Sequence, residues 1–178
     1  MYLTKRTYVK NWDYMKPKQR YKVTVLKGGK PTHIKPERVS YITEVLGYWR
    51  KANAIHNWFV KNVQNGDDDC REYVVSEVEL KDLLDRVTEI LAKVKMVKGK
   101  IQNGKSYKDG KFVPIMEDGE YIKDPAIAEE LLPTTQGFFF GSTHYDENYI
   151  SDLKETKKII KRAIKEAETG TILYSSSW

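Results

Sequence analysis

Residues 76–97 place the tightest constraint on the fold, because they combine a helix start signal with a long apolar stripe. Ser76 and Glu79 have the spacing of a capping box, in which each side chain accepts a hydrogen bond from a backbone N–H at the helix start. Apolar residues then recur at steps of one to three, which place most of them on one side of a helix: Val78, Leu80, Leu83, Leu84, Val87, Ile90, Leu91 and Val94. This period predicts a helix from Ser76 to about Val97 whose apolar side faces the core.

Two other segments show the same helical period. From about Glu37 to Val63 the apolar positions are Val45, Tyr48, Ala52, Ile55, Phe59 and Val63. From roughly Glu147 to Glu168 they are Tyr149, Ile150, Leu153, Ile159, Ile160, Ala163 and Ile164. Both patterns predict long helices with one apolar face, the second ending at Gly170.

Strand and turn signals occupy the rest of the chain. Residues 1–35 alternate between polar and apolar and predict two strands. Asp109-Gly110 and Asp118-Gly119 are hairpin turn signals within residues 99–122, and a short helix is expected from Pro125. The predicted fold class is α+β, with three long helices packed on a small antiparallel sheet and a projecting β-hairpin.

Size and charge suggest the organisation of the chain. With 178 residues, of which 40% are hydrophobic, it suits one compact domain: a basic N-terminal β arm at 1–36 and an α+β body at 37–178, with a hairpin insertion at about 99–122. Residues 1–38 hold 11 Lys and Arg against 2 Asp and Glu, which leaves 31 − 11 = 20 against 25 − 2 = 23 elsewhere. The basic arm predicts non-specific contact with nucleic acid or another anionic partner, and a solubilising lysine-rich surface is the alternative.

Other features concern location and assembly. The single cysteine, Cys70, can form no disulfide within the chain, and no apolar run is long enough for a membrane helix. The N-terminus lacks the apolar core of a signal peptide. We expect a protein of the host cell cytoplasm that does not contact membranes. Long amphipathic helices in so small a protein often pair, so a homo-oligomer is an open alternative to a monomer.

The first candidate site is the stretch GYWRKANAIHNWFV at residues 47–60. An aromatic ring can stack on a base, an amide can bond its edge, and a guanidinium can pair with a phosphate. The residues that supply these groups are Trp49, Arg50, Asn53, His56 and Trp58. The alternative is that Trp49 belongs to the core, that His56 is a hydrogen-bonded, half-buried imidazole and that Arg50 faces solvent.

The second candidate is the segment LLPTTQGFFFGST at residues 131–143, in which three phenylalanines lie between two glycines. Its predicted ligand-binding residues are Thr134, Thr135, Gly137, Phe139, Gly141, Ser142 and Thr143. Glycines allow close approach, and hydroxyls and backbone amides can hold an anion. The turn has no lysine, so it is no Walker A loop, and Asp146 with Glu147 favours ordinary capping of the next helix.

The third candidate is Asp67-Asp68-Asp69-Cys70 with His56 upstream. These side chains could bind a divalent metal, but the spacing matches no zinc pattern. A Cys70–His56 nucleophile pair lacks the flanking sequence of a nucleophile elbow. We therefore predict no cofactor, no metal and no catalytic residue, and favour binding without chemistry.

Three strings in the chain also carry a resemblance: YWRKANAIHNWFV at 48–60, DDC at 68–70 with Tyr73, and LLPTTQGFFFGSTHYDENY at 131–149. They resemble a small protein family encoded by bacteriophages and prophages, over about residues 37–165. The resemblance implies a phage accessory protein with no catalytic residues to carry over. With the candidate sites it favours a counter-defence sponge that sequesters a small nucleotide. The alternatives are an inhibitor that binds a host defence protein, and a metal-dependent nuclease or phosphodiesterase.

Overall fold

The computed structural model describes residues 1–137 and 142–177. The strands in these ranges are β1 (Tyr2–Tyr8), β2 (Leu26–Lys27), β3 (Lys30–Pro31), β4 (Tyr41–Tyr48), β5 (Tyr73–Val74), β6 (Met96–Lys108), β7 (Lys111–Ile122) and β8 (Thr171–Ser175). The α-helices are α1 (Asn53–Asn62), α2 (Glu77–Lys93), α3 (Ala126–Leu131) and α4 (Glu147–Glu166). Single turns of 3₁₀ helix cover Pro17–Gln19, Pro36–Arg38 and Ala167–Thr169.

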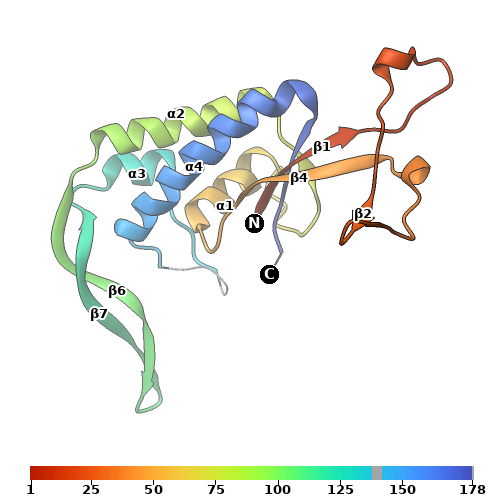
Figure 1. The fold of residues 1–178 in the computed structure, drawn as a ribbon. Helices are drawn as coiled ribbons and strands as arrows, with labels where there is room; N and C mark the ends of the chain where they lie inside the picture. The colour runs from red at the N-terminus through yellow and green to blue at the C-terminus, as the bar shows by residue number, and fades with distance from the viewer. Residues whose placement is uncertain (138–141, 178) are drawn as a thin grey trace.

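The body is an antiparallel sheet with the strand order β4–β1–β8–β5, covered on one face by helices (Figure 1). Strands alternate their side chains, so each contributes to both faces. Leu3, Leu46 and Tyr174 are buried in one core with residues of α1, α2 and α4. Tyr2 and Tyr48, which pair across β1 and β4, lie on the other face and are exposed.

The prediction of three long helices is wrong. Residues 41–48 form strand β4, and α1 has 10 residues, α2 has 17 and α4 has 20. The fold remains α+β, but it contains more sheet than expected. Ile42, Thr43 and Val45 are β-branched and favour a strand where a partner strand is present. Val45 is 62% exposed, so it is no part of a buried helix face.

Gly47 shows why α4 can lie directly on β4. A Cβ atom at this position would come within 2.4 Å of the Ile159 side chain on α4. Real Cβ atoms do not approach other atoms so closely, and glycine alone leaves room for the isoleucine. The helix therefore packs against backbone at this point of the sheet.

Several local predictions are confirmed. Ser76 and Glu79 form the predicted capping box, with Glu79 N–H donating to Ser76 Oγ at 3.2 Å and Ser76 N–H donating to Glu79 Oε2 at 2.6 Å. Strands β6 and β7 form the predicted hairpin with its turn at Asp109-Gly110, where both φ angles are positive.

The second predicted turn, Asp118-Gly119, is wrong: both residues lie inside β7, where they pair with Lys100 and Gly99. The helix expected to reach Val97 ends at Lys93, because Met96 already pairs with Ile122.

Two parts of the chain extend away from the body in opposite directions (Figure 1). One is the β6–β7 hairpin. The other is the segment between β1 and β4, which holds most of the lysine-rich N-terminal region and exposes Trp12, Tyr14 and Tyr21. Strand β1, which also belongs to residues 1–36, lies inside the sheet between β4 and β8. No helix in the described ranges is long and apolar enough to cross a membrane.

Candidate functional site

A cleft with a volume of about 1160 Å³ lies where four segments meet. These segments are the approach to α1 and its first turn, the first two turns of α4, part of β6, and the chain on both sides of residues 138–141. Small-ligand pockets usually measure roughly 300–1,000 Å³, so the cleft has room for a nucleotide. Most of its lining is polar.

Asn53 joins the two sequence stretches that were predicted as separate candidate sites. Its Nδ2 donates to the Ser142 carbonyl oxygen at 2.9 Å, and its Oδ1 accepts from the Thr135 N–H at 3.2 Å. The Thr134 hydroxyl donates to the Thr143 carbonyl at 2.9 Å. Asn53 is buried, so these bonds are protected from water. The first turn of α1 therefore does meet the chain at residues 135 and 142 in space.

The start of α1 forms a positively charged side of the cleft. Arg50 and Lys51 line it, both are exposed, and neither makes an ion pair with another described residue. Lys51 has a φ of 62°, a left-handed conformation that is uncommon outside glycine. Such strain is often found at functional positions.

The backbone at the same place adds further donors. Ala52 occupies the N-cap position of α1, where its side chain cannot accept a hydrogen bond, and the first turn has no acidic residue. Among the described residues, no acceptor takes the N–H groups of residues 53–55. Uncapped N–H groups and the helix dipole favour an anion at such an end.

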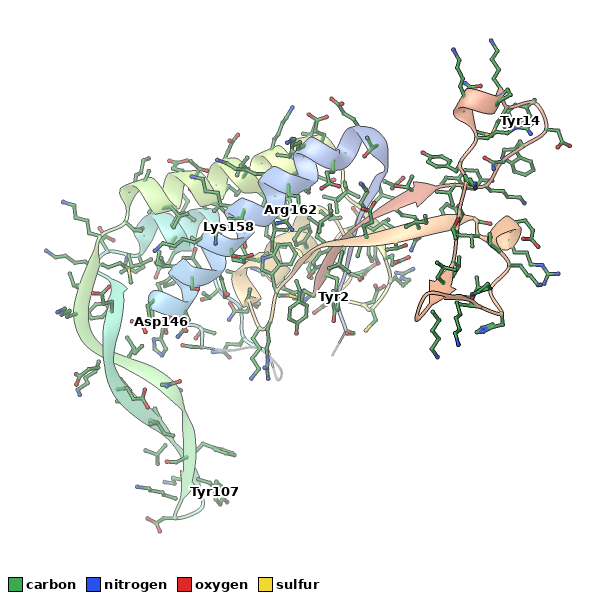
Figure 2. The ribbon with its side chains drawn as sticks, viewed as in Figure 1. Tyr2, Tyr14, Tyr107, Asp146, Lys158 and Arg162 are labelled. Atoms are coloured by element: carbon green, nitrogen blue, oxygen red, sulfur yellow. The ribbon has the colours of Figure 1, made fainter. Side chains whose placement is uncertain are left out.

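The start of α4 forms an acidic side of the cleft. Asp146 lies at the N-cap position, as Figure 2 shows at the end of the helix near β7, and its Oδ1 accepts from the N–H groups of Asn148 and Tyr149. This confirms the predicted capping by an acidic residue. Asp152 lies six residues further on and also lines the cleft. Burial, together with the charge of Asp146, raises the pKa of Asp152 to about 7.

The structure separates the predicted ligand-binding residues into three groups. Those that line the cleft are Arg50, Asn53, Thr134, Gly137, Ser142 and Thr143. Those that do not line it are Trp49, His56, Trp58 and Thr135. Phe139 and Gly141 lie outside the described residues.

The two tryptophans are part of the core. Trp49 is 3% exposed, and its Nε1 donates to the Thr156 hydroxyl at 2.9 Å. Trp58 is 4% exposed, and its Nε1 donates to Asp82 at 3.1 Å. Since neighbouring side chains cover both rings, neither offers a free face on which a base could stack.

His56 is buried and belongs to a hydrogen-bond network that does not line the cleft. Its Nε2 is 3.0 Å from Asp68 Oδ1, and its Nδ1 is 2.7 Å from the Tyr174 hydroxyl. A carboxylate only accepts hydrogen bonds, so the neutral ring carries its proton on Nε2 and Tyr174 donates to Nδ1. Burial lowers the pKa of His56, and the hydrogen bond to Asp68 opposes this shift.

In the third candidate site, Asp68 and Asp69 form hydrogen bonds with different partners. Asp69 accepts from Arg71 and Tyr73, while Cys70 is exposed. Within residues 1–137 and 142–177, no group of three or more His, Cys, Asp or Glu side chains is arranged to hold a metal ion.

Several cleft residues were not among the predicted site residues. Examples are Lys51, Gln102, Asn103, His144, Asp146 and Asp152. The uncapped start of α1 was missed because residues 37–63 were expected to be one continuous helix. The β-branched residues Ile42, Thr43 and Val45 were the available sequence signal for a strand that ends before Arg50. No local sequence pattern predicts that Gln102 and Asn103 belong to the site. They line the cleft because of the position that strand β6 takes in the fold.

Comparison of the chain with protein families, with curated proteins and with solved structures finds no match. The resemblance to a bacteriophage-encoded family therefore stays a prediction that rests on the quoted motifs.

Proposed function

We propose that this protein binds a small nucleotide-type ligand in the cleft between α1 and α4 and sequesters it without chemistry. The observation that carries the proposal is the positively charged side of the cleft. There Arg50, Lys51 and the uncapped start of α1 lie beside a chain segment that Asn53 holds in place.

A phosphate group suits this side of the cleft for two reasons. Guanidinium and ammonium groups form charge-assisted hydrogen bonds with phosphate oxygens. The N–H groups in the first turn of α1 have no acceptor among the described residues, so they can donate hydrogen bonds to a phosphate. The dipole of the helix adds to this attraction. Arg50 and Lys51 have no competing ion pair among the described residues, so a ligand would not have to displace one.

Binding without turnover fits the groups that surround this position. Arg50, Lys51 and backbone amides attract a phosphate without accepting a proton from a nucleophile. The pair formed by buried His56 and exposed Asp68, which has the chemistry of a base and its orienting group, does not line the cleft. The placement of His56 and Asp68 outside the cleft supports a sponge over a nuclease or phosphodiesterase that would use this pair.

A biological role follows from the resemblance to phage-encoded proteins. A phage protein that captures a nucleotide signal would lower its free concentration in the host cytoplasm and so counter a nucleotide-dependent defence. The motifs that carry the resemblance include Asn53 and its hydrogen-bond partners Thr135 and Ser142. The proposed ligand site therefore overlaps two of the three quoted motifs.

The experiment is a thermal-shift screen with mono-, di- and cyclic nucleotides and NAD-derived molecules, in which each ligand is recovered and checked by chromatography. Ligand at one hundred times its dissociation constant should stabilise the fold by about 2.7 kcal/mol. Arg50→Gln should weaken binding roughly 10- to 100-fold, since it removes one charge-assisted pair. Arg38→Gln is the matched control, because it removes the same charge from an exposed position outside the cleft.

The outcomes separate the hypotheses. A shift with the ligand unchanged supports sequestration, and a shift with the ligand altered makes the protein an enzyme. If no nucleotide shifts the unfolding temperature, or if Arg38→Gln weakens binding as much as Arg50→Gln, the proposed site is wrong.

A second candidate function is the blocking of a host protein by the β6–β7 hairpin. Tyr107 and Phe112 at its tip are 67% and 72% exposed, and the centroids of their rings are 5.2 Å apart. Exposed aromatic pairs of this kind are common anchors in protein interfaces. Because Gln102 and Asn103 line the cleft, deletion of the whole hairpin would alter both candidate surfaces. The double variant Tyr107→Ser, Phe112→Ser tests the tip alone and should abolish capture of a host protein while nucleotide binding is kept.

A further inference from the structure

Only one of the two carboxylate oxygens of Asp146 accepts hydrogen bonds from described residues. The residue is 1% exposed, and both hydrogen bonds that cap α4 go to Oδ1. Oδ2 is buried and has no hydrogen-bond partner among the described residues. A buried carboxylate oxygen without a donor is unfavourable, so a donor that reached it would be bound strongly.

Asp152 is in a similar position. It lines the same cleft, and no described residue donates a hydrogen bond to its carboxylate. Its pKa is raised to about 7 by burial first and by the charge of Asp146 second. The ionised carboxylate is therefore poorly solvated and lacks a compensating group within the protein.

The ionisable residues that line the cleft set the polarity of its two sides. They are Arg50, Lys51, His144, Asp146, Tyr149 and Asp152. The basic pair precedes α1 and the acidic pair belongs to the start of α4. A ligand that satisfies both sides has an anionic end and an end with N–H donors, and a nucleotide with an amino-bearing base has both.

We propose that Asp146 and Asp152 form the base-reading side of the cleft and select nucleotides whose base edge carries an amino group, as in cytosine, adenine and guanine. This inference rests on the proposed function, because it assumes that the phosphate lies beside Arg50 and Lys51. Carboxylates only accept hydrogen bonds, so they pair with an amino group and repel the carbonyl oxygen that replaces it in uracil or hypoxanthine.

The test compares nucleotides that differ at this one group. Binding of CMP and UMP, and of AMP and IMP, is measured by calorimetry at pH 8 in the presence of EDTA. In at least one pair the amino-bearing member should bind about tenfold more tightly or better. Asp152→Asn should reduce that ratio to about twofold or less, because an amide offers one acceptor and one donor in place of two acceptors.

Asp85→Asn is the matched control, since it makes the same chemical change on the exposed side of α2. It should leave the ratio unchanged. Asp146 is kept in all variants, because its Oδ1 caps α4 and its replacement would also disturb the helix start.

Each result has one meaning. If the members of both pairs bind equally, or if Asp152→Asn leaves the ratio intact, the inference is overturned while the proposed function stands. If none of the four nucleotides binds with or without Mg²⁺, the proposed function fails and the inference fails with it. If binding needs Mg²⁺ and Asp152→Asn weakens all four alike, the carboxylates hold a cation with the phosphate, and base reading is overturned.

Discussion

The side-chain amide of Asn53 donates a 2.9 Å hydrogen bond to the carbonyl oxygen of Ser142, 89 residues further along the chain. Together with the bond from the Thr135 N–H to Asn53 Oδ1, it ties the first turn of α1 to both flanks of residues 138–141. One buried amide thus connects the basic start of α1 with the hydroxyl-bearing segment across the cleft.

Asn53→Asp removes the donor to Ser142 and keeps the acceptor for Thr135. We expect a loss of about 1–3 kcal/mol in the free energy of unfolding, because the Ser142 carbonyl loses its donor and a charge is placed in a buried position. Hydrogen exchange should become faster at residues 134–136 and 142–144. Asn57→Asp, which removes one bond to the Pro133 carbonyl, is the comparison and should cost less because Asn57 is less buried. Equal protection of these segments in both variants would contradict a special role for Asn53.

Trp49→Ala should destabilise the protein by about 3–5 kcal/mol, because it leaves a cavity and removes the partner of Thr156. Denaturant titration would measure this loss. Arg50→Ala, at the next position, should change stability by less than about 0.5 kcal/mol, since the side chain is exposed. If Trp49→Ala folds normally and loses only nucleotide binding, the assignment of this ring to the core is wrong.

Gly47→Ala should cost about 1–3 kcal/mol, because the added methyl group would overlap Ile159. Shortening the facing side chain in the double variant Gly47→Ala, Ile159→Ala should recover part of this loss relative to the sum of the two single changes. A double-mutant cycle by chemical denaturation measures the coupling. Strict additivity would mean that α4 does not depend on this contact.

Lys51→Gly tests whether the strained residue is kept for its charge. Glycine adopts a φ of 62° without strain, which offsets its greater freedom in the unfolded chain, so stability should stay within about 1 kcal/mol. Nucleotide binding should weaken, because the ammonium group is lost. Asn65→Gly changes another residue of positive φ, one that does not line the cleft, and should leave binding intact. Unchanged binding in Lys51→Gly would remove Lys51 from the site.

Asp152→Asn should stabilise the protein in a pH-dependent way. The pKa of Asp152 is about 7 in the folded protein against 3.8 as its ordinary value, so between these values the folded state binds more protons than the unfolded state. The contribution of Asp152 to stability therefore falls as pH rises from about 4 to 7. We expect the variant to unfold at a higher temperature than the parent at pH 8 and at nearly the same temperature at pH 4. A constant difference across this range would contradict the raised pKa.

Much of the secondary structure could be predicted because its signals are local. The capping box at Ser76 and Glu79, the Asp109-Gly110 turn and the period of residues 147–168 all act within a few neighbouring residues. The candidate site was predicted in part for the same reason. Arg50, Asn53 and Thr134 could be predicted to bind a polar ligand from their side-chain chemistry alone, and all three line the cleft.

By itself, then, the sequence determined where α2, α4 and the β6–β7 hairpin form, since caps, turns and periodicity need no distant partner. Only the tertiary structure decided that residues 41–48 are a strand, because pairing with β1 outweighs their weak helical period. It likewise placed Trp49 in the core and Asp152 in the cleft. The physical reason is that burial depends on which residues from far along the chain cover a side chain, and no local pattern carries that information.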